Sequence, residues 1–500
     1  MLSATLEIHV LNVGQGDAVL VVNRDLDAAK NAIAAAKGAA KVPSNPIDYI
    51  PYAVKNGIRL TGTVRKALLV DGGDDGYGGN VVDYLTTFGV IDERRLLQPD
   101  LALVVSHYHD DHIAGLRSVF KQRIDPKAPG QRATLADRFR PGIVYQSLPG
   151  RKTNPPSQRF ADFQRDLTAA VTAAVDRTEY VDVYPGGLTG VYRGEDDPTI
   201  KIGLGAGVNG YPITVHVLAS GQAVWNAAAR QVVPIKSVGS AVDQNDRSIV
   251  LMLEYGSFRC LLGGDIAGNG GAGGGNFGGN AIGPGEKRYF SVHADVESVL
   301  GPALEAYFPQ TPDGEWLAGK PKFTAPGYAT VFKANHHGSS SSVDVHLLAT
   351  LAPLVFVGSS GVKARFHAHP TQQVMNRIDA TQTPQWGRRA SGPVKADKVQ
   401  EPNTIKGAYL TEVAAKVKGK SFTVDTRAAK IMGTTVVRPV DETIAQIQQA
   451  TAKGQQLSVQ VYGAGILTAL ADPRSSLRPT APVSADGIYP IGPFTHFDLH

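Results

Sequence analysis

The chain has 500 residues, which exceeds the usual size of one hydrophobic core and allows either one elaborated domain or two unequal domains. Its 50 Lys and Arg residues exceed its 45 Asp and Glu residues by five, an excess too small to indicate a nucleic-acid surface. The single cysteine, Cys260, excludes an intramolecular disulfide and a cysteine-cluster zinc site, and it favours a reducing compartment.

The N-terminal third predicts a hairpin, two further strands and two helices. Residues 6 to 22 alternate as two strands around the turn Gly14-Gln15-Gly16-Asp17, and an alanine-rich helix is expected over 25 to 41. A buried strand at 67 to 70 precedes a helix at about 81 to 88. The unbroken apolar run from Leu101 to Val105 predicts a strand that is covered on both faces.

The rest of the chain mixes strands and helices. Between about 121 and 208 the sequence is polar and proline-interrupted, and only a helix near 160 to 175 stands out. Further on, the pattern predicts strands at 213 to 218, 248 to 253, 258 to 262, 329 to 333 and 354 to 357, and helices near 294 to 307, 343 to 351 and 370 to 378. Strands occur in adjacent pairs and in alternation with helices, so we expect two sheets with helices packed outside.

A cluster of imidazoles and carboxylates follows the strand at 101 to 105. The sequence Ser106-His107-Tyr108-His109-Asp110-Asp111-His112 lies between this strand and a helix expected to open at Ile113. A rigid strand end can bring His107 and His109 to one point, while Asp111 and His112 project differently and can serve a second ion. These ligand types suit zinc and are also used by manganese.

This H-x-H-x-D-H pattern resembles the signature of the metallo-β-lactamase superfamily, which implies an αββα sandwich of two mixed sheets packed face to face. Asp71 in Leu-Leu-Val-Asp-Gly-Gly, Asp265 in Leu-Leu-Gly-Gly-Asp-Ile and His337 in Asn-His-His-Gly resemble its other strand-end motifs, in the same order. The resemblance implies that Asp265 bridges two ions, that His337 binds one of them, and that Asp71 supports the ligand loop.

Further phrases resemble one branch, the hydrolase domain of ComEC-type competence proteins, over about residues 6 to 425. They are Leu-Asn-Val-Gly-Gln-Gly-Asp-Ala from Leu11, Asn-Asp-Arg-Ser from Asn245, the glycines before Asp265, His-His-Gly-Ser from His336, and His369-Pro370. The resemblance implies a nuclease-like activity. We therefore expect a hydrolase domain over 1–425, with insertions at about 23–60 and 121–208, and a C-terminal extension of unknown role over 426–500.

One ligand of the wider superfamily is absent. Many members supply a further histidine between the first cluster and the bridging aspartate, and the only histidine there is His216, within a strand-like run where a structural role is favoured. ComEC-type proteins resemble this chain in lacking it. The first metal position is thereby short of one protein ligand.

Other residues near the motifs are candidates for supporting or substrate roles. Asp17 is expected to support a ligand, and His336 to orient His337. His369 precedes a proline at a helix start, where it either protonates the leaving group or caps the helix. Lys333 and Arg247 are candidates for neutralising a phosphate. The glycine-rich run from 263 to 285 lacks Walker spacing, so a loop near the site mouth is favoured over a phosphate cradle.

The leading hypothesis is a metal-dependent hydrolase that cleaves DNA or RNA with a metal-held hydroxide on one or two Zn²⁺ or Mn²⁺ ions. The metal ligands are expected to be His107, His109, Asp111, His112, Asp265 and His337, with Asp111, Asp265 and His369 as catalytic residues. Hydrolysis of a small ester, lactone or amide is the alternative, and a non-catalytic metal-binding module the third. No signal peptide and no run of 18 apolar residues occurs, so a cytoplasmic protein without membrane contact is expected.

Overall fold

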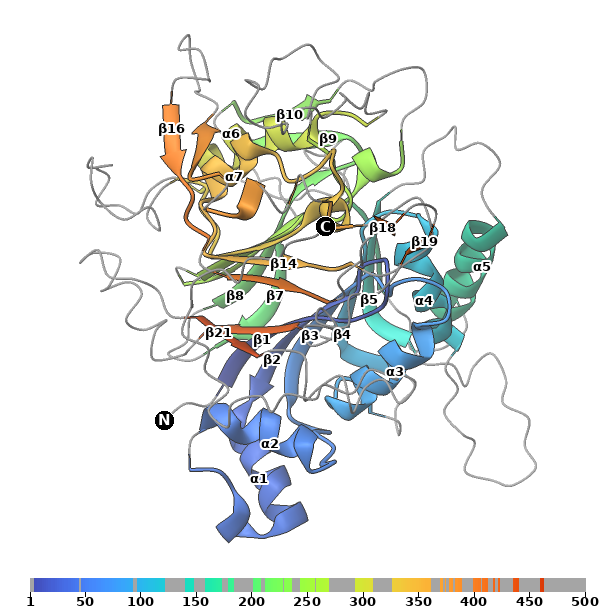
Figure 1. Cartoon of the computed structure of the whole chain (residues 1–500). Helices are drawn as coiled ribbons and strands as arrows, with labels where there is room; N and C mark the ends of the chain where they lie inside the picture. Colours follow the sequence, from blue (N-terminus) through green and yellow to red (C-terminus); the bar gives the residue numbers. More distant parts are fainter. Residues whose placement is uncertain are drawn as a thin grey trace.

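The computed structural model of the chain is shown in Figure 1. It describes residues 4–44, 46–92, 97–121, 140–147, 158–172, 179–183, 201–207, 212–227, 229–235, 243–256, 258–268, 293–308, 326–360, 369–371, 374, 377–380, 383–388, 399–405, 407–411, 417–418, 421–422, 435–439 and 459–462. Among these residues, no helix is long and apolar enough to cross a membrane.

The first sheet has eight strands in the order β21-β20-β1-β2-β3-β4-β5-β6. Their bounds are β1 Ala4–Val10, β2 Val19–Asp25, β3 Val64–Val70, β4 Leu97–Val105, β5 Arg140–Ser147, β6 Glu179–Val183, β20 Thr435–Pro439 and β21 Val459–Tyr462. Pairing is antiparallel from β21 through β3 and parallel from β3 through β6. The N-terminal hairpin expected from the sequence is confirmed.

The second sheet has the order β10-β9-β8-β11-β12-β13-β14-β17, with β7 also paired to β8. Its strands are β7 Lys201–Ala206, β8 Pro212–Ser220, β9 Ala223–Asn226, β10 Gln231–Pro234, β11 Val250–Tyr255, β12 Phe258–Leu262, β13 Val331–Lys333, β14 Val355–Gly358 and β17 Gly407–Leu410. Strands β12, β13, β14 and β17 run parallel to one another. Two small ribbons pair β15 Gln385–Arg388 with β16 Val399–Pro402, and β18 Val417–Lys418 with β19 Ser421–Phe422.

Three hydrophobic layers show how the sheets and helices stack. Alternate residues of one strand face opposite sides of a sheet, and Leu68 lies in the layer between the two sheets while Leu69 lies in the layer beneath the helices. Helices α1 Leu26–Lys37, α2 Tyr49–Lys55, α3 Gly78–Thr87, α4 Asp110–Lys121 and α5 Gln158–Thr172 cover the first sheet. Helices α6 Val296–Tyr307 and α7 Val345–Leu351 cover the second (Figure 1). The predicted arrangement of two mixed sheets between outer helices is confirmed.

Three sequence-based expectations are refined. Helix α4 begins at Asp110 and not at Ile113, because Asp110 and Asp111 suit the partly positive first turn of a helix. Within the helix expected over 370–378, residues 374, 377 and 378 are helical, and residues 372, 373, 375 and 376 lie outside the described residues. Within 426–500, β20 pairs with β1 and β21 pairs with β20, so this part of the chain extends the first sheet.

Candidate metal centre

The candidate ligands stand at the carboxyl ends of parallel strands from both sheets. In the first sheet, β3 ends just before Asp71 and β4 ends just before residues 106–112. In the second, β12 leads to Asp265, β13 to residues 336–337 and β14 to Ser359. Parallel neighbours end at the same edge of a sheet, so chain segments up to 288 residues apart, from Asp71 to Ser359, meet at one place.

One carboxylate oxygen lies at the centre of the site. Asp265 Oδ2 is 3.2 Å from the Nε2 atoms of both His112 and His337. The same oxygen is 3.8 Å from His336 Nε2 and 4.0 Å from His107 Nε2. Burial alone would raise the pKa of Asp265, but the surrounding imidazoles outweigh it and hold the pKa well below its usual value.

Four of these side chains form one compact group of potential ligands. The facing atoms of Asp111, His112, Asp265 and His337 all lie within 4.8 Å of one another. Ligands 2.0–2.1 Å from a tetrahedral ion are separated from each other by about 3.3 Å. The distance from His337 Nε2 to Asp111 Oδ2 is 3.4 Å, and its distance to Asp265 Oδ2 is 3.2 Å, so the spacing fits a divalent metal.

The buried atoms of this group fit a metal for a second reason. The Nε2 atoms of His107, His112 and His337 and the Oδ1 atom of Asp265 are buried and make no hydrogen bond within the described residues. Buried polar atoms are almost always hydrogen-bonded, because a missing partner costs about 1–3 kcal/mol. Several such atoms around one point are satisfied together when they bind a cation.

Asp71 lies behind this group and orients it. Its carboxylate accepts hydrogen bonds from the Ser106 N–H at 2.8 Å and the Ser106 hydroxyl at 2.5 Å, and it lies 2.8 Å from His112 Nδ1. With the His112 proton on Nδ1, the lone pair of Nε2 faces Asp265. Burial lowers the pKa of His112, but the carboxylates of Asp265 and Asp71 outweigh it and raise the pKa well above its usual value.

His107 is fixed by hydroxyl groups. Its Nδ1 lies 3.1 Å from Ser106 Oγ and 3.3 Å from Ser248 Oγ, and the Asp265 N–H donates to the same Ser248 oxygen at 3.0 Å. Burial, followed by the charge of His112, lowers the pKa of His107 well below its usual value, so its ring is neutral and its Nε2 lone pair is available.

Lys333 supports a ligand and does not face a substrate. Its side chain is 1% exposed, and its Nζ donates to Asp17 Oδ2. Asp17 Oδ1 in turn lies 3.3 Å from His337 Nδ1, which also lies 3.0 Å from the Ser359 carbonyl oxygen. Asp17, which is expected from the sequence to support a ligand, therefore lies beside His337, and Lys333, considered there for neutralising a phosphate, is buried against Asp17.

Glu297 of α6 is a supporting residue that the sequence motifs did not reveal. Its carboxylate accepts from Asn335 Nδ2 at 2.7 Å, from Val343 N at 2.9 Å and from Asp344 N at 2.6 Å. It therefore holds both ends of residues 335–344, the loop that carries the two adjacent histidines. Burial and then the Asp344 carboxylate raise the pKa of Glu297 to about 8. A Glu within a helix is common, and no local pattern distinguishes this one.

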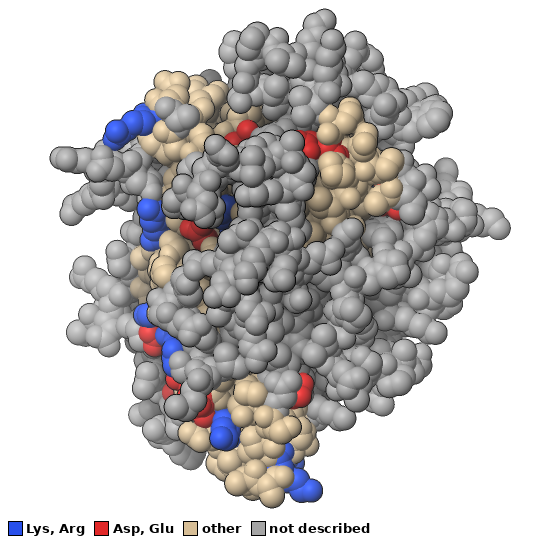
Figure 2. Space-filling model, turned by 90° about the vertical axis from the view of Figure 1, so that its left-hand side faces the viewer, with Lys and Arg blue, Asp and Glu red and all other residues tan. Residues whose placement is uncertain are grey.

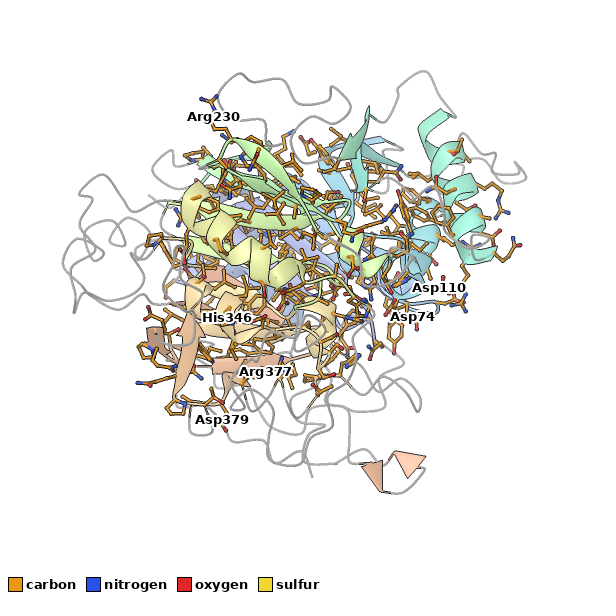
Figure 3. The ribbon with its side chains drawn as sticks, turned by 90° about the horizontal axis from the view of Figure 1, so that it is seen from above. Asp74, Asp110, Arg230, His346, Arg377 and Asp379 are labelled. Carbon is orange, nitrogen blue, oxygen red and sulfur yellow. The ribbon has the colours of Figure 1, made fainter. Side chains whose placement is uncertain are left out.

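Arg377, which is labelled in Figure 3, also holds this loop. Its guanidinium donates to the carbonyl oxygens of Ser342 at 2.7 Å, Ser340 at 3.1 Å and Val343 at 3.3 Å. The Glu297 carboxylate accepts hydrogen bonds from N–H groups of the loop, and the Arg377 guanidinium donates to its carbonyl oxygens. Together they bind both donors and acceptors of the loop.

The remaining predicted histidines lie at the rim of the group. The His109 ring meets the His107 ring edge-on, with centroids 4.9 Å apart. The ring of His369, which is 7% exposed, is 5.8 Å from that of His336 and 6.4 Å from that of His337. Both stand next to the compact group without belonging to it.

Among the other candidates, His216 has partners away from the compact group. His216 has one ring nitrogen 3.0 Å from the Tyr307 hydroxyl and the other 3.0 Å from the Glu254 carboxylate, as a structural histidine would. Arg247 lies in the 3₁₀ turn Asn245–Arg247 before β11, between Asn245, which contacts His336, and Ser248, which contacts His107. Most of the glycine-rich run from 263 to 285 lies outside the described residues.

Comparison with known proteins adds little to this geometry. No protein-family model matches the chain, and no curated protein matches it. Among solved structures it is similar to the metallo-β-lactamase fold protein YhfI from Bacillus subtilis, with 10% identity and a TM-score of 0.30 over 75% of this chain and 91% of that chain. At this score the similarity supports no conclusion about the site, which is defined by its own side chains.

Proposed function

We propose that the protein is a metal-dependent hydrolase of the metallo-β-lactamase type. The observation that carries this proposal is the convergence of four imidazole Nε2 atoms on Asp265 Oδ2, at 3.2 to 4.0 Å. A divalent ion bound here supplies a water of lowered pKa, near 7, and neutralises charge on the attacked group. The residues of the compact group would hold it.

We propose a phosphodiester substrate, with DNA or RNA as the leading class. Support comes from the sequence motifs that resemble those of ComEC-type hydrolase domains. Surface charge adds no support: on the face in Figure 2 the described Lys and Arg residues stand beside Asp and Glu residues and form no continuous basic area.

The chain's own residues have distinct tasks in this proposal. Asp71 and Asp17 orient the imidazoles of His112 and His337, so that their Nε2 lone pairs face inward. Asp111, at the first turn of α4, is 25% exposed, more than the other three members of the compact group. His369 stands beside the group, where an imidazole can deliver a proton to a leaving oxygen.

Nuclease and metal assays test the proposal together. We expect purified protein to contain divalent metal and to cleave bis-p-nitrophenyl phosphate and labelled single-stranded or double-stranded DNA or RNA. A chelator should abolish cleavage, and His109→Ala should reduce it at least 100-fold, whereas His216→Gln should leave it unchanged. Undiminished cleavage by the His109→Ala protein would end the proposal. Turnover of lactones or β-lactams with none of phosphodiesters would move the assignment to carbonyl substrates.

A further inference from the structure

The centre leaves one metal position short of a ligand. The compact group accounts for Asp111, His112, Asp265 and His337. His107 Nε2 is fully buried and makes no hydrogen bond within the described residues, and it lies 4.0 Å from Asp265 Oδ2, outside that group. A second ion between His107 and Asp265 would satisfy this nitrogen, but it needs further ligands to complete a tetrahedron.

The histidine between the two motifs does not supply this ligand. Both ring nitrogens of His216 are engaged, one with Tyr307 of α6 and the other with Glu254 of β11. These partners belong to the layer between the second sheet and its outer helices. The ligand must therefore come from another segment of the chain.

His336 has the required position. Its Nε2 lies 3.8 Å from Asp265 Oδ2, close to the 4.0 Å that separates His107 Nε2 from the same oxygen. Asn245 Nδ2 lies 3.4 Å from this nitrogen and can only donate, so Nε2 is the unprotonated ring nitrogen, and a cation at the centre would replace this long contact. Unlike His337, His336 does not belong to the compact group, whose ligand atoms all lie within 4.8 Å of one another.

The backbone explains how two adjacent histidines serve two positions. His336 has φ 46° and ψ 44°, and His337 has φ 55° and ψ 13°. These left-handed conformations are costly for residues other than glycine and accumulate at functional sites. They turn the two rings apart, with centroids separated by 6.1 Å and planes at 73°. The clamps of Glu297 and Arg377 hold the backbone in this conformation.

A neighbouring segment holds the His336 ring in place. The His293 ring meets it edge-on, with centroids 5.2 Å apart and planes at 89°. His293 lies 3.6 Å from the Asp243 carboxylate and 3.7 Å from that of Asp246, and the second oxygen of Asp246 accepts from Ala294 N at 2.8 Å. The backbone N–H of His336 also donates to the carbonyl oxygen of Gly264, the residue before Asp265, at 2.9 Å.

We propose that His336 is the third imidazole of the first metal position, which it shares with His107 and His109, while Asp265 bridges this position to the compact group. The inference rests on the proposed function, in that the centre holds divalent ions. His336 then replaces the histidine ligand that many members of the superfamily supply between the 107–112 cluster and the bridging aspartate. The protein then binds two ions per chain, although the sequence motifs supply only a partial first position.

Metal stoichiometry tests this assignment without an activity assay. After dialysis against Zn²⁺ and removal of loose metal, elemental analysis should find two ions in the unaltered protein and one in His336→Asn. Asparagine tolerates the left-handed backbone, and His336→Gly provides a second variant that relieves it. His216→Gln is the matched control and should retain two ions. Circular dichroism establishes that each variant is folded.

Each outcome of this experiment has a defined meaning. A fall from two ions to one, or at least a tenfold weaker second binding step in either variant, supports the assignment. Two tightly bound ions in a folded His336→Asn or His336→Gly protein would overturn it and leave the proposed hydrolase intact, with His336 contacting substrate. An unaltered protein that binds no divalent ion would overturn the proposed function and this assignment with it.

Discussion

Among single residues, Asp71 fixes the orientation and the tautomer of the His112 ring, and so the position of the Nε2 lone pair. Its carboxylate bonds to Ser106 through both oxygens and lies 2.8 Å from His112 Nδ1. We expect Asp71→Asn to weaken metal binding by about 10–100-fold, because an amide NH₂ that faces His112 favours the tautomer with the proton on Nε2. Competition with a chromogenic chelator measures the affinity. Asp75→Asn is the control, since that carboxyl is 67% exposed, and an equal loss in both would contradict the role given to Asp71.

Gly16 brings the N-terminal turn against a candidate ligand. Its φ is 145°, and a Cβ atom there would lie 2.2 Å from the Asp111 carbonyl oxygen. Gly16→Ala should therefore displace the start of α4 and destabilise the protein by about 1–3 kcal/mol, with weakened metal binding. Gly79→Ala is the matched control: a methyl group added there would meet no atom within 4 Å, and alanine in helix α3 should stabilise by about 0.5–1 kcal/mol. Thermal unfolding and metal titration of both variants check this, and equal behaviour would refute it.

At the scale of elements, α6 holds the histidine loop through a buried carboxylate. Removing this group in Glu297→Ala leaves the donors of Asn335, Val343 and Asp344 without their acceptor, at about 1–3 kcal/mol for each buried group that finds no substitute. We expect a lower midpoint of urea denaturation and weaker metal binding. Glu305→Ala on the same helix is the control, because the Glu305 carboxylate accepts a hydrogen bond from the Thr350 hydroxyl of α7. Unchanged metal affinity in Glu297→Ala would show that the clamp does not position His337.

The raised pKa of Glu297 makes the stability of the protein depend on pH. Burial and then Asp344 raise the pKa of Glu297 from 4.5 to about 8. Between these values the folded chain binds a proton that the unfolded chain has lost, so the contribution is complete below about pH 4.5 and disappears as pH rises to about 8. The stability of the unaltered protein relative to Glu297→Gln should therefore fall between pH 5 and pH 8. Urea denaturation at several pH values measures it, and a constant difference would refute the raised pKa.

The elements differ in how much of them could be predicted from sequence. Buried strands such as Leu101 to Val105 show as apolar runs, and the spacing of His107, His109 and His112 carries its own chemistry. The hydrogen bond between Lys333 and Asp17 joins residues 316 positions apart, and Glu297 lies 32 residues after Asp265. Such contacts form only when the two sheets pack together. The hydrophobic periodicity of a short stretch of sequence does not predict them.

At the scale of the whole molecule, the two sheets supply one site because their parallel strands end at a common edge. Asp71 and His112 come from the first sheet, whereas Asp265 and His337 come from the second. The layer between the sheets, which includes Val104 and Leu262 just before the ligand loops, is buried and apolar. Its close packing fixes the separation of the ligands. Changes that let the sheets shift should therefore weaken metal binding even when they lie far from the histidines.

The strands near the C-terminus belong to this framework. Strand β20 pairs with β1, with Ile8 opposite Val437, and the Val437 side chain is fully buried in the layer between the sheets. Without β20, β1 would become an exposed edge, with its backbone N–H and C=O groups available for pairing between molecules. Burial of Val437 alone is worth about 1.5–3 kcal/mol.

Two truncations separate this structural contribution from the remainder of the C-terminal region. A chain that ends at residue 425 should unfold at a lower temperature than the full chain, aggregate at lower concentration and bind metal less tightly, because it lacks the cover of β1. A chain that ends at residue 463 retains β20 and β21 and should unfold at a higher temperature than the chain that ends at residue 425. Differential scanning calorimetry and light scattering distinguish the two. Full stability of the shorter chain would show that 1–425 is complete by itself and that β20 is only an accessory to the sheet.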